Sequence, residues 1–144
     1  MPRMNKKNGF ACFGAIQKNE RWSWSAITPR KDKVIITIWD HELMGPKKDY
    51  YDTRELVDIP PSEWQNHLGN NERIELLRYA QKNLDGILYV LMCEAKDKQK
   101  HPLEIRGVYP WKADDKYNRV RLTFLDQTVG HYRVEYLDAV TMRK

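Results

Sequence analysis

The sequence has few of the residues that most metal sites and many enzyme active sites require. Its two cysteines, Cys12 and Cys93, lie far apart and form no metal-spaced pair, and its four histidines show no close spacing. It contains no Gly-x-Ser-x-Gly nucleophile motif and no glycine-rich loop ahead of a helix. These absences exclude the common zinc-site, acyl-transfer and nucleoside triphosphate signatures. We predict no cofactor, no metal site and no catalytic residue.

Long hydrophobic runs are absent as well. No stretch of about 18 apolar residues occurs, and residues 1–8 are polar and basic, unlike a signal peptide. We therefore expect a cytoplasmic protein with no membrane partner, in which residues 1–8 are a flexible basic lead-in. Cys93 lies inside the apolar run 87–93, which is typical of a reduced and buried thiol.

The composition is that of one folded domain with a basic surface. A chain of 144 residues can bury most of its apolar surface without disulfides or metals, so we predict a single domain over residues 1–144. The net charge is +5, because 25 Lys and Arg residues outnumber 20 Asp and Glu residues. This balance favours an anionic partner such as nucleic acid, and a solvated basic surface is the alternative.

The clearest local pattern is a β-hairpin that is rich in tryptophan. Residues 22–27 alternate large aromatic with small polar side chains, which places Trp22, Trp24 and Ala26 on one face of a strand and the serines between them on the other. Residues 34–39 are mostly β-branched and follow a charged turn of about six residues. We expect these two segments to pair.

The rest of the chain predicts one helix and further strands. Residues 71–85 carry an apolar stripe at helical spacing and end at Gly86, where a left-handed terminator belongs. Residues 87–95 read as a central strand, and residues 119–125 and 131–137 as alternating strands. Residues 10–16 fit either an edge strand or a turn of helix. The predicted fold class is α+β, with a curved, mostly antiparallel sheet or open barrel and one main helix packed on it.

The tryptophan hairpin also has the residue types that hold an extruded base. Such a base stacks between aromatic faces, polar groups read its edge, and Arg or Lys meet the flanking phosphates. The predicted base-binding residues are Trp22, Trp24, Trp39, Ser23, Asp40 and Glu42, and the predicted phosphate-binding residues are Arg21, Lys47, Lys48, Arg119 and Arg121. The competing interpretation is that at least two of these tryptophans fill the core.

A nuclease is an alternative from a different functional class. Asp85 followed by Glu94-Ala-Lys96 is similar to the pattern of metal-dependent restriction-type nucleases, in which two carboxylates converge on one cation. A strand over residues 86–95 would hold Asp85 and Glu94 roughly 30 Å apart, so they cannot share a metal. Asp40 or Glu42, at the end of a neighbouring strand, could take the place of Asp85.

Four segments together resemble a small bacterial and phage module that can occur beside HNH-type nuclease domains. They are Arg21-Trp-Ser-Trp-Ser-Ala, Ile38-Trp-Asp-His-Glu42, the helix start at Glu72-Arg73, and the run from Tyr89 to Asp97. The resemblance covers roughly residues 10–110. It implies DNA modification or restriction, and a PUA-like fold similar in type to the PUA, EVE and SRA readers of modified bases. The expected partner is DNA in preference to RNA, with a nuclease or host defence protein as a further partner. The remaining alternative is a phage or host protein-binding factor that makes no nucleic-acid contact.

Overall fold

A computed structural model of the chain describes residues 3–19, 23–55, 68–97, 99, 104–110, 118–128 and 130–137. The helices are α1 (Lys6–Ala11) and α2 (Leu68–Asn83), with short 3-10 turns η1 (Asp40–Glu42) and η2 (Thr53–Glu55). The strands are β1 (Ser25–Ile27), β2 (Val34–Trp39), β3 (Tyr50–Asp52), β4 (Ile87–Ala95), β5 (Ile105–Pro110), β6 (Arg119–Leu125) and β7 (Tyr132–Tyr136).

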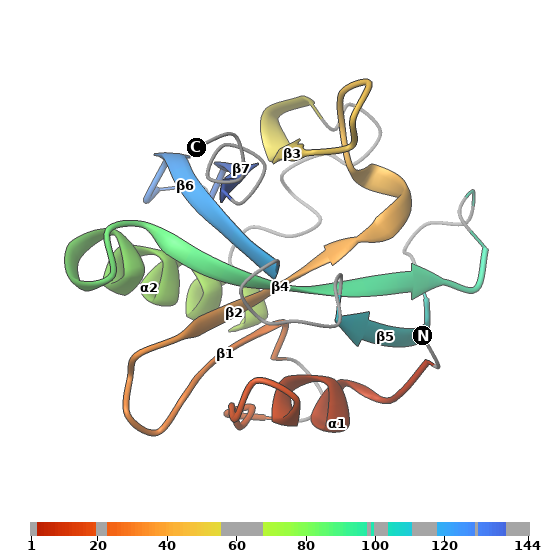
Figure 1. The fold of residues 1–144 in the computed structure, drawn as a ribbon, viewed down its shortest axis with the longest axis horizontal. Coiled ribbons are helices and arrows are strands. Elements are labelled where there is room, and N and C mark those ends of the chain that lie inside the picture. Colours follow the sequence, from red (N-terminus) through yellow and green to blue (C-terminus); the bar gives the residue numbers. More distant parts are fainter. Residues whose placement is uncertain are drawn as a thin grey trace.

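The described strands form one open sheet of seven strands that does not close into a barrel (Figure 1). The order is β1-β2-β4-β6-β7-β3, and β5 pairs with β4 beside this path. All pairs are antiparallel except β2 with β4. The predicted α+β class, with a mostly antiparallel sheet and one main helix, is therefore confirmed.

Strand β4 is the centre of the sheet, as the apolar run predicted. Its first half pairs with β6, its second half pairs with β5, and β2 runs parallel to it along the other edge. The predicted hairpin is also present, because Ala26 of β1 lies opposite Ile35 of β2. A strand that is flanked on both edges and covered on both faces needs side chains without charge, which explains why residues 87–93 are continuously apolar.

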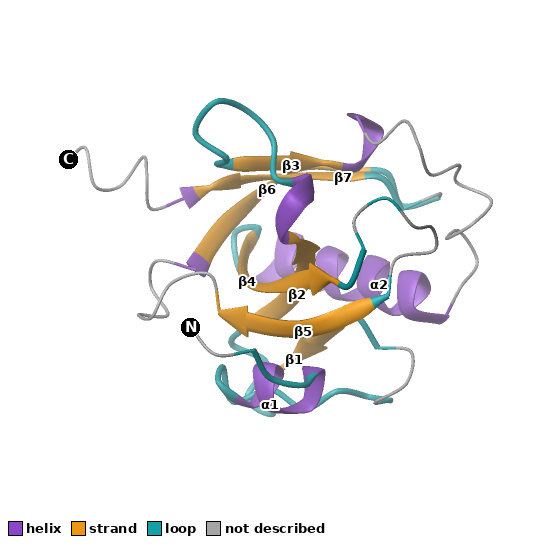
Figure 2. Ribbon diagram, turned by 90° about the vertical axis from the view of Figure 1, so that its right-hand side faces the viewer, coloured by secondary structure: helices purple, strands orange, loops and turns teal. Residues whose placement is uncertain are grey.

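The two faces of β2 and β4 belong to two separate cores. Val34, Ile36 and Ile38 pack with Leu77 of α2 and with strands β6 and β7. The alternate residue Ile35 packs on the other face with Phe10 and its neighbours from the α1 region. Helices α1 and α2 therefore cover opposite faces of the central strands, and Figure 2 shows α1 below β5 and β1.

Helix α2 covers most of the predicted helix 71–85 but begins earlier, at Leu68, and ends at Asn83, and the left-handed terminator lies at Gly86 as the sequence indicated. Asp85 and Gly86 adopt φ values of +56° and +75°, and the Gly86 N–H donates to the Ala80 carbonyl at 2.9 Å. This left-handed turn satisfies a carbonyl of the last helical turn and directs the chain into β4. Of the helices in the described ranges, none combines the length and the apolar character that a membrane crossing requires.

The segment that precedes the hairpin has more structure than its sequence indicated. Met4, which we expected within a flexible lead-in, pairs with Val108 of β5 through two backbone hydrogen bonds of 3.0 and 2.8 Å. The Asn5 side chain then caps α1 by accepting from the Asn8 N–H at 2.8 Å. The apolar stretch at residues 10–16 begins as the end of α1 and continues as a turn. Its apolar residues Phe10 and Phe13 are buried.

Candidate functional site

The described tryptophans of the hairpin lie together on the α1 face of the sheet. The Trp24 and Trp39 rings are half-buried, with centroids 5.9 Å apart and planes tilted by 45°. The Lys6 Nζ lies 4.0 Å from the centre of the Trp24 ring. Because the two rings contact each other and Lys6 occupies one face, the pair is closed to a base inserted between them. Arg21 and Trp22 lie outside the described residues.

Ser23 has a structural position in the loop ahead of β1. It is fully buried, its Oγ accepts from the Asn19 N–H at 2.9 Å, and its own N–H donates to the Asn19 carbonyl at 2.9 Å. Its carbonyl accepts from Lys6 and from Gln17, both at 3.2 Å. Ser25 is buried as well. The serine face of the predicted strand therefore points into the protein, and Ser23 holds the loop closed.

Asp40 and Glu42 lie in η1, directly after β2, and both accept a hydrogen bond from a tyrosine. The Tyr109 hydroxyl donates to Asp40 Oδ2 at 2.7 Å, and the Tyr51 hydroxyl donates to Glu42 Oε1 at 3.3 Å. Burial, and next the bond to Asp40, raise the pKa of Tyr109. The two carboxylates are placed at the strand end as predicted, in contact with the core.

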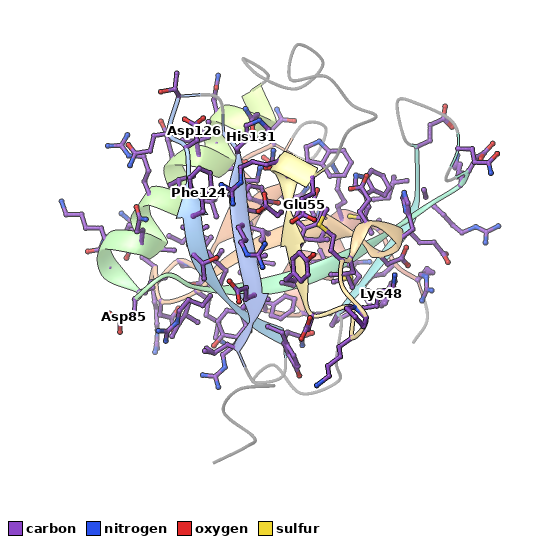
Figure 3. The ribbon with its side chains drawn as sticks, turned by 90° about the horizontal axis from the view of Figure 1, so that it is seen from above. Lys48, Glu55, Asp85, Phe124, Asp126 and His131 are labelled. Atoms are coloured by element: carbon purple, nitrogen blue, oxygen red, sulfur yellow. The ribbon has the colours of Figure 1, made fainter. Side chains whose placement is uncertain are left out.

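The predicted phosphate-binding residues lie in two separate places. Lys47 and Lys48 are exposed on the turn before β3. Figure 3 shows Lys48 on this turn, where it has a φ of +53°. Arg119 and Arg121 lie on β6, opposite the first residues of β4, and Arg119 pairs with Tyr89. Trp39 lies opposite Cys93, four residues further along β4, which is about 13 Å at the rise of a strand. The structure therefore does not bring β6 and the tryptophan pair to one site.

Of the carboxylates in the nuclease alternative, Asp40 and Glu94 lie at neighbouring positions of two paired strands, whereas Asp85 does not. Strands β2 and β4 run parallel, and Trp39 lies opposite Cys93. The next residues, Asp40 and Glu94, therefore follow at the same end of this strand pair. Glu94 accepts from Arg3 at 3.0 and 3.3 Å, and Asp85 lies at the other end of β4. Within the described ranges, no three His, Cys, Asp or Glu side chains form a group that could hold a metal ion.

The structure contains a cationic cleft that sequence reasoning missed. It has a volume of about 570 Å³ and lies between the first described residues and β5. We call it the basic cleft; its lining residues are Arg3, Met4, Asn5, Lys6, Lys7, Gln17, Ile105, Arg106 and Gly107. None of these described lining residues is acidic. The sequence shows three basic residues close together, Arg3, Lys6 and Lys7. They line a cleft only because Met4 pairs with Val108 and so places them beside β5.

Lys6 connects the basic cleft to the tryptophan pair. Its Nζ donates to the Ser23 carbonyl beside Gln17 Nε2 and lies over the Trp24 ring. Burial lowers the pKa of Lys6, because the ammonium loses contact with water. Gln17 Oε1 is buried and has no hydrogen-bond partner within the described part of the chain. Lys6 and Gln17, which both line the cleft, thus meet at the Ser23 carbonyl.

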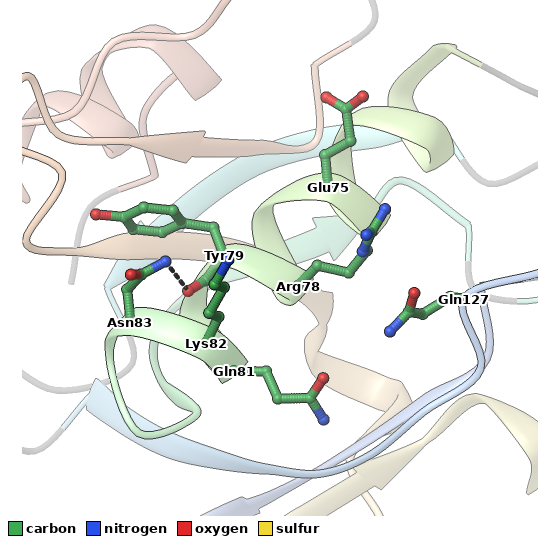
Figure 4. Close-up of a pocket in the computed structure, with 7 residues that line it drawn as sticks. All are labelled: Glu75, Arg78, Tyr79, Gln81, Lys82, Asn83 and Gln127. Carbon is green, nitrogen blue, oxygen red and sulfur yellow. Dashed lines mark hydrogen bonds between the residues drawn. The ribbon is translucent and has the colours of Figure 1, made fainter.

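A second hollow, of about 470 Å³, lies on the outer surface of α2 (Figure 4). Its lining residues are Glu75, Arg78, Tyr79, Gln81, Lys82, Asn83 and Gln127. Asn83 Nδ2 donates to the Tyr79 carbonyl at 3.2 Å, and the charges around the hollow have both signs. This surface lacks the single sign of charge that distinguishes the basic cleft.

No protein-family model, curated protein or solved structure matches the chain. The resemblance to a module found beside HNH-type nuclease domains therefore stays a prediction. The geometry of the basic cleft and of the tryptophan pair is the basis for a functional proposal.

Proposed function

We propose that the protein is a nucleic-acid-binding module, with DNA as the favoured ligand and the basic cleft as its contact surface. The observation that supports this proposal is the convergence of Arg3, Lys6, Lys7 and Arg106 on one cleft, where none of the described lining residues is acidic. Such a cluster attracts phosphate groups, because binding releases the counterions that surround a nucleic acid. A role in restriction or phage defence is the setting that the sequence resemblance implies.

The aromatic contribution to binding comes from the end of β2. Trp24 has one face covered by Lys6, whereas Trp39 is half-buried at the strand end with the His41 ring centroid 6.3 Å from its own. Stacking on an aromatic ring is tolerant of base identity, because every base has a π face. In this proposal Trp39 contacts a base at the rim of the site, and the cleft contacts the backbone.

Binding of labelled single- and double-stranded DNA and RNA, measured by fluorescence anisotropy at two salt concentrations, tests the proposal. Arg106 is exposed on β5, so Arg106→Ala removes charge from the cleft without opening the core. We expect it to weaken binding and to reduce the slope of log K against log salt by about 1. Arg78→Ala is the matched control, because Arg78 is exposed on α2, which covers the opposite face of the sheet.

Three results would argue against this function. Binding that does not respond to salt would mean that phosphate contacts are absent. Equal losses in Arg106→Ala and Arg78→Ala would mean that net charge acts without a site. Copurification with a protein, and no mobility shift of any nucleic acid, would favour the protein-binding factor instead.

A further inference from the structure

Strands β5 and β6 follow one another along the same edge of β4. Gly107 of β5 lies opposite Glu94. Arg121 of β6 lies opposite Ile87. These two positions of β4 are seven residues apart, which is about 23 Å at the rise of a strand. Because Arg106 is adjacent to Gly107 and lines the basic cleft, the cleft and β6 lie in line along the central strand.

The arginines at the two ends of this line are on the same side of the sheet. Arg106 lines the basic cleft together with Lys6 of α1, so it lies on the α1 side. On β6, the buried Val120 packs in the core on the α2 face. Because side chains alternate along a strand, its neighbours Arg119 and Arg121 point to the α1 side as well. We call Arg106, Arg119 and Arg121 the arginine row.

Helix α1 leaves the β6 end of the arginine row open. Among the residues that the structure describes, the core on the α1 face contains none from β6 or β7. That core extends to Tyr89 of β4, whose ring centroid lies 5.9 Å from that of Phe13. Arg121 and Thr123 are exposed, and Arg119 is half-buried. Figures 1 and 2 both show β6 apart from α1, so the β6 arginines are accessible to a large ligand.

The surface along the arginine row has a net positive charge. Glu135 of β7 lies opposite Arg121, and it also accepts from Arg133 Nε at 3.2 Å. At the cleft end, Glu94 pairs with Arg3 at 3.0 Å. Each of these two carboxylates thus has an arginine partner outside the row. The remaining positive charge suits a ligand with regularly spaced anionic groups, such as the phosphates of a nucleic acid.

Building on the proposed nucleic-acid function, we propose that a strand bound in the basic cleft continues along β4 and places further phosphates on Arg119 and Arg121. Successive phosphates of a stacked strand are about 3.4 Å apart, so a path of about 23 Å corresponds to about seven nucleotides. The ligand of this site is an extended segment of polynucleotide, in preference to a free nucleotide or a short end. Arg119 and Arg121 act as phosphate contacts that position the strand.

The dependence of binding on ligand length tests this inference. Fluorescence anisotropy is measured with single-stranded oligonucleotides of about 4 and about 16 nucleotides, because the shorter one spans only about 14 Å when stacked. Arg121→Ala should weaken binding of the longer oligonucleotide about threefold and reduce its slope of log K against log salt by about 0.7. The affinity for the shorter oligonucleotide should not change. Arg106→Ala should weaken binding of both lengths.

Arg78→Ala is the matched control for Arg121→Ala. It removes the same charge from an exposed position of α2, which covers the opposite face of the sheet. We expect it to keep the affinity of the original protein for both oligonucleotides, apart from the small effect of net charge.

The outcomes separate this inference from the proposed function. A loss in Arg121→Ala that is confined to the longer oligonucleotide, and is absent in Arg78→Ala, supports the inference. Unchanged binding of the longer oligonucleotide in Arg121→Ala, an equal loss in Arg78→Ala, or an equal loss for both lengths in Arg121→Ala overturns the continuous path. Nucleic-acid binding at the cleft still stands in those cases if Arg106→Ala weakens it. Absence of binding to every nucleic acid, by a folded protein, overturns both.

Discussion

Gly9 of α1 lies so close to Leu91 of β4 that a Cβ atom at Gly9 would be 2.9 Å from Leu91 Cδ2. Both residues are buried, and Leu91 is part of the core on the α1 face of the sheet. A side chain at position 9 would therefore push α1 away from the central strand. Since α1 follows directly after Met4 and Asn5, this contact also sets the position of one wall of the basic cleft.

Gly9→Ala should destabilise the protein even though alanine is a better helix former than glycine. The overlap with the packed side chains of Val108, which would lie nearest to the added Cβ, and of Leu91 costs about 1–3 kcal/mol, and the helix propensity of alanine returns at most about 1 kcal/mol. Chemical denaturation measures the difference. Asn8→Ala is the control, because Asn8 is exposed in the same helix. Equal stability of the two variants would mean that α1 is not packed as described.

The main elements of the fold were predictable because each has a strong local pattern. The hairpin alternates, the residues of α2 carry an apolar stripe that ends at Gly86, and the residues of β4 form a continuous apolar run. The parallel pairing of β2 with β4 was not predictable in the same way. Strands β2 and β4 are neighbours in the sheet although β3 and α2 lie between them in the chain. Such a pairing depends on the path of the whole chain and leaves no local sequence pattern.

The candidate site was less predictable, because its residues meet only through tertiary pairing. Lys6 and Arg106 are 100 positions apart and share a cleft because Met4 pairs with Val108. The alternation around Trp24 correctly placed this side chain opposite the serines. The alternation could not show that the serine face of the strand is the more buried face. The burial of this face depends on the packing of α2 against β1.

Trp39→Ala should weaken nucleic-acid binding more than Trp24→Ala does. One face of Trp24 is occupied by Lys6, whereas Trp39 lies at the strand end. Loss of a stacked base corresponds to about 1–3 kcal/mol of binding free energy. Trp24→Ala should instead lower the free energy of unfolding by about 2 kcal/mol, less than for a fully buried tryptophan. Anisotropy and chemical denaturation on both variants separate these effects, and unchanged affinity in both would remove the tryptophans from the site.

Asp52 should make the stability of the protein depend on acid pH. Its side chain is 3% exposed and accepts hydrogen bonds from the Arg54 backbone and guanidinium and from Arg133. The hydrogen bonds from Arg54, more than those from Arg133, lower the pKa of Asp52 below its ordinary value of 3.8. The unfolded chain therefore binds the proton first as pH falls. The stabilisation is fully present well above pH 3.8 and is lost as pH falls through the folded-state pKa.

Asp52→Asn checks this dependence. We expect it to lower the free energy of unfolding at pH 7 by about 1–3 kcal/mol, because hydrogen bonds to a charged group are lost. Denaturation curves between pH 7 and pH 3 should then show a smaller acid-induced loss than in the original protein. Asp85→Asn changes an exposed carboxylate after α2 and should keep the original acid-induced loss. Parallel pH profiles for Asp52→Asn and the original protein would contradict the assignment.

Glu94→Gln gives opposite results for a binding module and for a nuclease. Glu94 pairs with Arg3 at 3.0 Å, and Arg3 lines the basic cleft, so the change removes the negative charge that pairs with Arg3. A partly exposed pair of this kind is worth about 0.2–1 kcal/mol, so we expect DNA affinity at low salt to rise about two- to threefold. In the nuclease alternative, the same change would abolish Mg²⁺-dependent cleavage. Anisotropy and a cleavage assay on plain, methylated and glucosylated DNA measure both.

The matched control for Glu94→Gln is Glu75→Gln, which makes the same change of charge at an exposed position of α2. Because α2 covers the opposite face of the sheet, Glu75 should not influence an anion in the basic cleft beyond the small effect of net charge. An equal rise in affinity for the two variants would mean that Arg3 does not contact DNA. Cleavage by the original protein that disappears in Glu94→Gln and persists in Glu75→Gln would replace the binding module with a nuclease, because Glu94 would then act at the reacting phosphate.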